Sequence, residues 1–97
     1  MFTSKERSNL RAMAQNIKPV TQVGKGGISD TLVESLSQAL EARELIKISV
    51  LNNVEDDARD IAENLAELLS AEVVAVIGKK VVLYRRSNRK DIQHVVY

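Results

Sequence analysis

The chain has 97 residues, 44% of them apolar, and no cysteine, which predicts one small globular domain and excludes a disulfide framework and a thiolate metal site. No segment approaches the roughly 18 apolar residues that a membrane helix needs, and the N-terminus has no signal-peptide run, so we expect a soluble, cytoplasmic protein. The net charge is +1, but residues 1–27 carry five cations and one anion, residues 28–72 three cations and eleven anions, and residues 73–97 six cations and one anion. Two basic ends around an acidic middle favour an anionic partner, although charges that only solvate surface helices would give the same pattern.

The N-terminal segment predicts a helix. Thr3 and Glu6 have the spacing of a capping box, and apolar residues then recur at helical spacing as far as Ile17. Pro19 ends this helix, and residues 20–23 can form a short strand.

A second helix follows, which Ser29 can cap and in which leucines recur every four residues over positions 32–40. The segment 46–51 then alternates apolar residues with Lys47 and Ser49, which predicts a strand with one buried and one solvated face.

A third helix is expected from about Glu55 to Ser70, with its carboxylates gathered at the start, where the helix dipole favours them. The segment 72–77 is apolar on both faces, so we expect it at the centre of the sheet. The pair Gly78-Lys79 predicts a tight turn into a strand over 81–86, which together with the preceding strand makes a hairpin.

The predicted order is helix, strand, helix, strand, helix, strand, strand, which indicates an α+β fold (αβαβαββ) with a mixed four-stranded sheet covered by three helices. We expect a single domain over residues 1–97, with 87–97 as a partly ordered basic tail. We expect Tyr84 in the core. His94 has no carboxylate nearby in sequence except Asp91 and no nucleophile, so we expect no catalytic activity. The carboxylates Asp56, Asp57 and Asp60 lack the spacing of a calcium loop, so we expect no metal, and we expect no other cofactor.

Three of the four glycines lie in one turn, at Gly24, Gly26 and Gly27, with Lys25 between them. Glycines let a ligand approach the backbone closely, and the start of a helix offers free N–H groups with a partial positive charge. Such a turn suits a phosphate, although a plain tight turn between strand and helix remains an alternative.

A nucleotide fits this turn poorly, because the Walker pattern is absent and the third glycine of the dinucleotide pattern is replaced by Ser29. The turn also reads as G-x-x-G, the loop that lies against successive phosphates in KH modules. A nucleic-acid backbone is therefore the favoured ligand.

The stretches LRAMAQNIKPVTQVGKGGISD, IKISVL and AEVVAVIGKKVVLYRR, in this order of elements, resemble the CRM domain in its stand-alone bacterial, YhbY-type form. The resemblance runs from about Lys5 to Arg86. It implies a fold similar to the C-terminal domain of translation initiation factor three and an RNA-binding protein that associates with precursors of the large ribosomal subunit. The RNA contact of the family is attributed to its GxxG loop, which matches Gly24–Gly27 here, and to adjacent basic surface.

Three aromatic residues cannot form a row of base-stacking platforms, so we expect contacts to the RNA backbone and a preference for structured RNA. We expect the protein to be a monomer and its RNA to be ribosomal RNA. For Arg85 and Arg86, ordinary solvation of a strand end is an open alternative. The residues expected to contact RNA are Gly24, Lys25, Gly26 and Gly27 of the loop, Arg7, Arg11 and Lys18 of the first helix and its end, and Lys79, Lys80, Arg85 and Arg86 of the hairpin. The rival hypothesis is a protein-interaction module that docks on ribosomal or splicing proteins through an acidic helix face of Asp60, Glu63 and Glu67.

Overall fold

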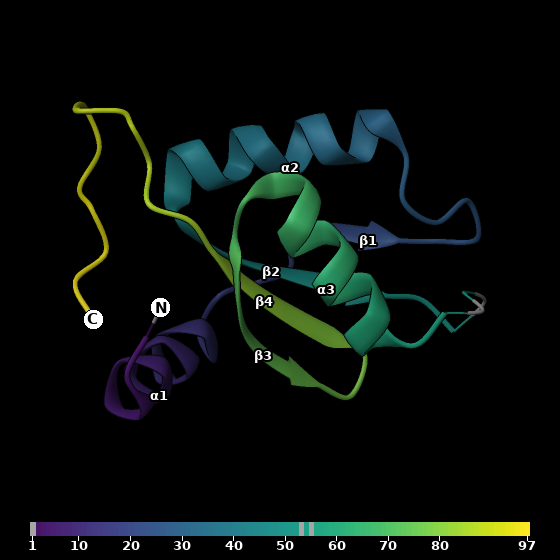
Figure 1. The fold of residues 1–97 in the computed structure, drawn as a ribbon, viewed down its shortest axis with the longest axis horizontal. Helices are drawn as coiled ribbons and strands as arrows, with labels where there is room; N and C mark the ends of the chain where they lie inside the picture. The colour runs from purple at the N-terminus through teal and green to yellow at the C-terminus, as the bar shows by residue number, and fades with distance from the viewer. Residues whose placement is uncertain (1, 53, 55) are drawn as a thin grey trace.

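The computed structural model describes residues 2–52, 54 and 56–97. In this part of the chain, three helices and a four-stranded sheet form the predicted order αβαβαββ (Figure 1). The elements are α1 (Ser4–Ala14), β1 (Thr21–Val23), α2 (Asp30–Arg43), β2 (Leu45–Val50), α3 (Ala58–Leu69), β3 (Glu72–Ile77) and β4 (Lys80–Tyr84). None of the helices in the described ranges is long and apolar enough to span a bilayer.

The sheet has the strand order β1-β2-β4-β3. β1 and β2 are parallel, as expected for strands joined by a crossover helix, whereas β4 runs antiparallel to both of its neighbours. The expectation that residues 72–77 lie at the centre of the sheet is wrong, because β3 is an edge strand and β4 takes the central position. β3 is apolar on both sides because helices cover both of its faces: Val74 packs in the cluster beneath α1, and Val73 and Val76 pack against the opposite cluster.

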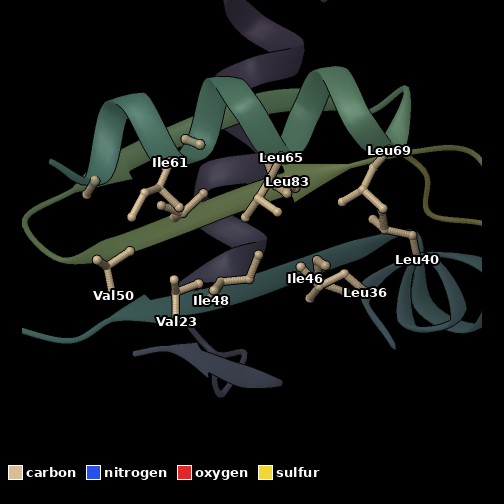
Figure 2. Close-up of a cluster of buried hydrophobic side chains, with 13 residues drawn as sticks. Val23, Leu36, Leu40, Ile46, Ile48, Val50, Ile61, Leu65, Leu69 and Leu83 are labelled. Atoms are coloured by element: carbon tan, nitrogen blue, oxygen red, sulfur yellow. The ribbon is translucent and has the colours of Figure 1, made fainter. Parts of the chain in front are cut away.

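The two faces of the sheet each carry a hydrophobic core. The larger core lies between the sheet and the helices α2 and α3, where Ile46, Ile48 and Leu83 meet Leu36 and Leu65 (Figure 2). The smaller core lies under α1. We call these two sides of the sheet the α2/α3 face and the α1 face.

The helix starts follow local sequence. Thr3 and Glu6 form the expected capping box, and the Ser29 hydroxyl accepts a hydrogen bond of 3.1 Å from the N–H of Leu32. α1 ends at Ala14, earlier than predicted, and the N–H of Ile17 bonds to the Ala14 carbonyl in a tighter turn. Lys18 therefore lies beyond the helix.

The third helix also starts later than predicted. Asp57 accepts from the N–H of Asp60 and takes the capping position, so α3 begins at Ala58. The predicted start at Glu55 lies outside the described residues.

The C-terminal segment is held by a carboxylate that the sequence did not single out. Glu44 ends α2 with a φ of 66° and is fully buried. Its oxygens accept from the N–H groups of Ser87 (2.7 Å) and Val95 (2.6 Å), and lie 2.6 Å from Nδ1 of His94. Burial alone would raise the pKa of Glu44, but these hydrogen bonds outweigh it and hold the pKa below the usual 4.5. Glu44 is thus the partner of His94 that we did not expect, and it anchors a tail without helix or strand.

Aromatic contacts join the two ends of the chain. Tyr84 is buried, as predicted, and its ring meets those of Phe2 and Tyr97 edge to face, with centroids 5.4 and 5.3 Å away. Figure 1 shows both termini beside α1, which agrees with these contacts. All three aromatic side chains of the protein therefore pack on one another.

Candidate nucleic-acid interface

The glycine turn lies between the end of β1 and the start of α2, as predicted. The N–H of Gly27 bonds to the Gly24 carbonyl at 2.8 Å and closes the turn. Lys25 and Gly26 at its tip are exposed, and in Figure 1 the turn projects beyond the sheet and α2. A ligand can therefore reach the tip of the turn and the first residues of α2.

The three glycines of the turn differ in how strongly the backbone and its surroundings favour glycine. Gly27 has a φ of 66°, which disfavours any side chain. A Cβ on Gly24 would lie 3.5 Å from Leu51 Cδ1, an ordinary contact. Gly26 has no positive φ, and apart from its two chain neighbours no described residue has a heavy atom within 4 Å of the position its Cβ would take. The backbone conformation thus favours glycine at Gly27 but gives no reason for glycine at Gly26.

An open hollow of about 390 Å³ lies beside this turn. Its described lining has hydroxyl and amide side chains but no carboxylate. The side chains with these groups are Thr21, Gln22, Ser29, Thr31 and Ser35. Hydroxyls and amides offer both donors and acceptors, so this surface can hydrogen-bond to phosphate and ribose oxygens.

The hairpin turn lies at the same end of the sheet as the glycine turn. The N–H of Val50, which pairs with Val23 at the end of β1, bonds to the Lys79 carbonyl at 2.7 Å. Lys80 Nζ lies 2.7 Å from Ser49 Oγ on the α1 face. The structure therefore brings Lys79 and Lys80 to the end of the sheet that carries the glycine turn.

Two of the predicted RNA contacts are engaged within the protein. Arg7 Nη1 donates to the Val73 carbonyl at 2.5 Å, beside the irregular pairing of β3. Arg85 donates from both terminal nitrogens, to the Leu69 carbonyl at 2.8 Å and to the Ser37 carbonyl at 3.0 Å. These guanidiniums therefore already donate to backbone carbonyls within the fold.

The remaining predicted cations differ in position. Arg11 and Lys18 are exposed, in α1 and in the connection from α1 to β1. Arg86 is also exposed, but it follows Tyr84 at the end of the sheet opposite to the glycine turn. Sequence spacing alone did not separate Arg86 from Lys79 and Lys80.

The charges separate by layer. α1 carries three cations and one anion, whereas α2 and α3 together carry two cations and six anions. In the described part of the chain, the ion pairs are Arg85–Glu41, Arg89–Asp91 and His94–Glu44. Lys25, Lys79 and Lys80 make no ion pair with any described carboxylate, so their charge is available to an anion. The acidic side chains Asp60, Glu63 and Glu67 are exposed on α3.

Lys47 also belongs to this surface, although it was not among the residues expected to contact RNA. It pairs with Val82, and its neighbour two residues on, Ser49, pairs with Lys80, so the two lysines lie diagonally on the α1 face. The alternation of residues 46–51 was the available signal, because it placed Lys47 on the solvated face.

Comparisons with known proteins agree with this architecture. The chain is 46% identical over 87 residues to the probable RNA-binding protein YqeI of Bacillus subtilis, covering 90% of this chain and 91% of that protein. It is 39% identical to the probable RNA-binding protein MJ0652 of Methanocaldococcus jannaschii, covering 87% of this chain and 63% of that protein. The solution structure of SAV1595 from Staphylococcus aureus superposes with a TM-score of 0.78 at 44% identity, covering 94% of this chain and 95% of that one. The family model of the CRS1 / YhbY (CRM) domain matches residues 2–85, and the chain belongs to this family.

Proposed function

We propose that the protein binds RNA and that the turn Gly24–Gly27 contacts the sugar-phosphate backbone. The observation that carries this proposal is Gly26, an exposed glycine that neither a positive φ nor a steric contact requires. Because Gly26 has no side chain, it leaves open space beside Lys25 and the start of α2. A phosphate needs such space in order to approach backbone N–H groups. The names of YqeI and MJ0652 and the membership of the CRM family support RNA as the ligand.

The proposed contact surface continues from the glycine turn to Lys79 and Lys80 at the same end of the sheet, and along the α1 face toward Arg11 and Lys18. We leave Arg7 and Arg85 out of it, because their guanidiniums already bond to backbone carbonyls. Arg86 contributes least, since it lies at the other end of the sheet.

The preferred RNA is structured. Aromatic side chains that stack on bases stand free in single-strand binders, whereas Phe2, Tyr84 and Tyr97 pack on one another here. Recognition therefore depends mainly on phosphate and sugar contacts and on RNA shape. Within the cell, we propose ribosomal RNA in precursors of the large subunit as the target, and crosslinking followed by sequencing of the bound RNA tests this assignment. Reads spread over messenger RNAs without a concentration in ribosomal RNA precursors would contradict it.

A salt titration of RNA affinity tests the contact itself. For a structured RNA hairpin, replacing Lys25 with alanine is expected to lower the slope of log K against log salt by about 0.9 if one phosphate contact is lost. Arg86→Ala is the matched control, an exposed cation away from the turn, and should leave the slope nearly unchanged.

The rival function, docking on a basic protein through α3, predicts the opposite pattern. In that case Lys25→Ala leaves RNA affinity unchanged, and the double variant Glu63→Gln, Glu67→Gln loses a protein partner. A flat salt response of the wild-type protein would refute the RNA proposal.

A further inference from the structure

A groove separate from the glycine turn lies where the last turn of α1 crosses the α1 face. It has a cavity volume of about 110 Å³. Ala14, Ala75 and Val82 contribute apolar surface, and Ile77 adds a side chain that is 54% exposed. Ile77 therefore extends the apolar surface of the groove to a position that a ligand can reach.

Cations line the same groove. Arg11 comes from α1, Lys47 from β2 and Lys80 from β4, and the described lining includes no carboxylate. None of the three makes an ion pair with a described residue. Three positive charges around one apolar surface fit a ligand with a flat, apolar part and an anionic part. A nucleotide has both, in its base and its phosphate.

The groove is continuous with the proposed RNA surface. A row of paired residues crosses the sheet from the strand that ends in the glycine turn to the groove. In order, it consists of Gln22, Ser49, Lys80 and Ile77. The Ser49 hydroxyl, 2.7 Å from Lys80 Nζ, holds this lysine over the α1 face. An RNA that contacts the glycine turn can therefore reach the groove along the sheet.

We propose that this groove binds one unpaired nucleotide of the RNA, with its base on the apolar surface and its phosphates near Lys47 and Lys80. The inference rests on the proposed RNA-binding function and adds a site to it. The guanidinium of Arg11 supplies the stacking plane, a role that Arg side chains fill for unstacked bases in RNA complexes. The preferred RNA is then a helix interrupted by unpaired nucleotides.

The test uses two RNA hairpins that differ only in an internal bulge of three nucleotides, adenosines in one and abasic sites in the other. The wild-type protein is expected to bind the adenosine hairpin about tenfold more tightly, within the range that one stacked base contributes. In a methyl NMR spectrum, the Ile77 signal should shift with the adenosine hairpin and much less with the abasic one.

Variants separate the groove from the glycine turn. Arg11→Lys keeps the charge but removes the plane, so discrimination between the hairpins should fall while the salt slope is retained. Ile77→Glu places a carboxylate at an exposed position of the groove and should abolish discrimination, with the fold checked by circular dichroism. Lys25→Ala should weaken both hairpins by the same factor and keep the discrimination.

The outcomes distinguish the two proposals. Equal binding of both hairpins by the wild-type protein overturns the groove and leaves the glycine turn in place. Discrimination that survives both Arg11→Lys and Ile77→Glu also overturns it, because the base is then bound elsewhere. Failure to bind either hairpin refutes the RNA function and the groove with it.

Discussion

Replacing Gly26 with alanine separates the folding role of the glycine turn from its proposed binding role. Beyond its two chain neighbours, the added Cβ would meet no described residue within 4 Å, and the backbone has no positive φ. A glycine-to-alanine change at such a position stabilises a protein by about 0.4–1 kcal/mol, because it restricts the unfolded chain. Gly26→Ala should therefore unfold at a slightly higher urea concentration than the wild type.

The neighbouring glycine gives the contrast. Gly27 has a φ of 66°, and alanine in this left-handed conformation costs about 1–2 kcal/mol. Gly78, in the β3–β4 turn, is the matched control, since its φ is 57° and the space around it is equally open. Gly27→Ala and Gly78→Ala should thus lose similar stability, and the difference between Gly26→Ala and Gly27→Ala should be about 2 kcal/mol.

Urea unfolding followed by circular dichroism measures the stability of these variants, and titration of a labelled RNA hairpin measures their affinity. Gly26→Ala should lose affinity although it is at least as stable as the wild type. Gly26→Asp should lose more, on the order of tenfold or greater, because a carboxylate would face the phosphates. If Gly26→Ala instead unfolds more easily by more than about 0.5 kcal/mol, the backbone itself needs this glycine. The inference from its open space would then be wrong, as it would be if Gly26→Asp bound RNA like the wild type.

Three further predictions concern stability. Arg85→Ala should lower the unfolding free energy by about 2 kcal/mol, because the carbonyls of Leu69 and Ser37 lose a charged donor. Urea unfolding measures this loss, and a loss below about 0.5 kcal/mol would show that Arg85 is free for RNA. The pKa of Glu44 is lower in the folded than in the unfolded protein, so the stability that Glu44 contributes is complete above about pH 4.5 and is lost as the pH falls through the folded pKa. Thermal melts from neutral to acid pH should show this loss. Glu44→Gln should be less stable than the wild type at neutral pH but should lose less stability on acidification. Burial raises the pKa of Tyr84 to about 12, and its hydroxyl has no hydrogen-bond partner in the described structure. Tyr84→Phe should therefore leave the unfolding free energy unchanged or raise it by up to about 1 kcal/mol. A melting temperature several degrees below that of the wild type would indicate a partner for the hydroxyl.

The sequence by itself determined the features that depend on neighbours along the chain. The capping box of Thr3 and Glu6, the cap at Ser29 and the Gly78-Lys79 turn each involve residues within one helical or hairpin turn, so their spacing was sufficient. The same holds for the glycine turn, which a strand precedes and a helix follows. The fold class followed because this order of elements, with short connections, leaves few arrangements.

The tertiary structure alone decided which groups meet across the chain. β3 is the edge strand because β4 pairs with both β2 and β3. Its residues are apolar on both faces because helices cover both faces, and not because the strand is central in the sheet. The engagement of Arg85 with Ser37, and of Glu44 with His94, joins residues about fifty positions apart. Such contacts depend on how the layers pack, which the spacing of residues along the chain does not reveal. The sequence could therefore indicate cations for RNA binding, but it could not show which of them bond to groups within the protein.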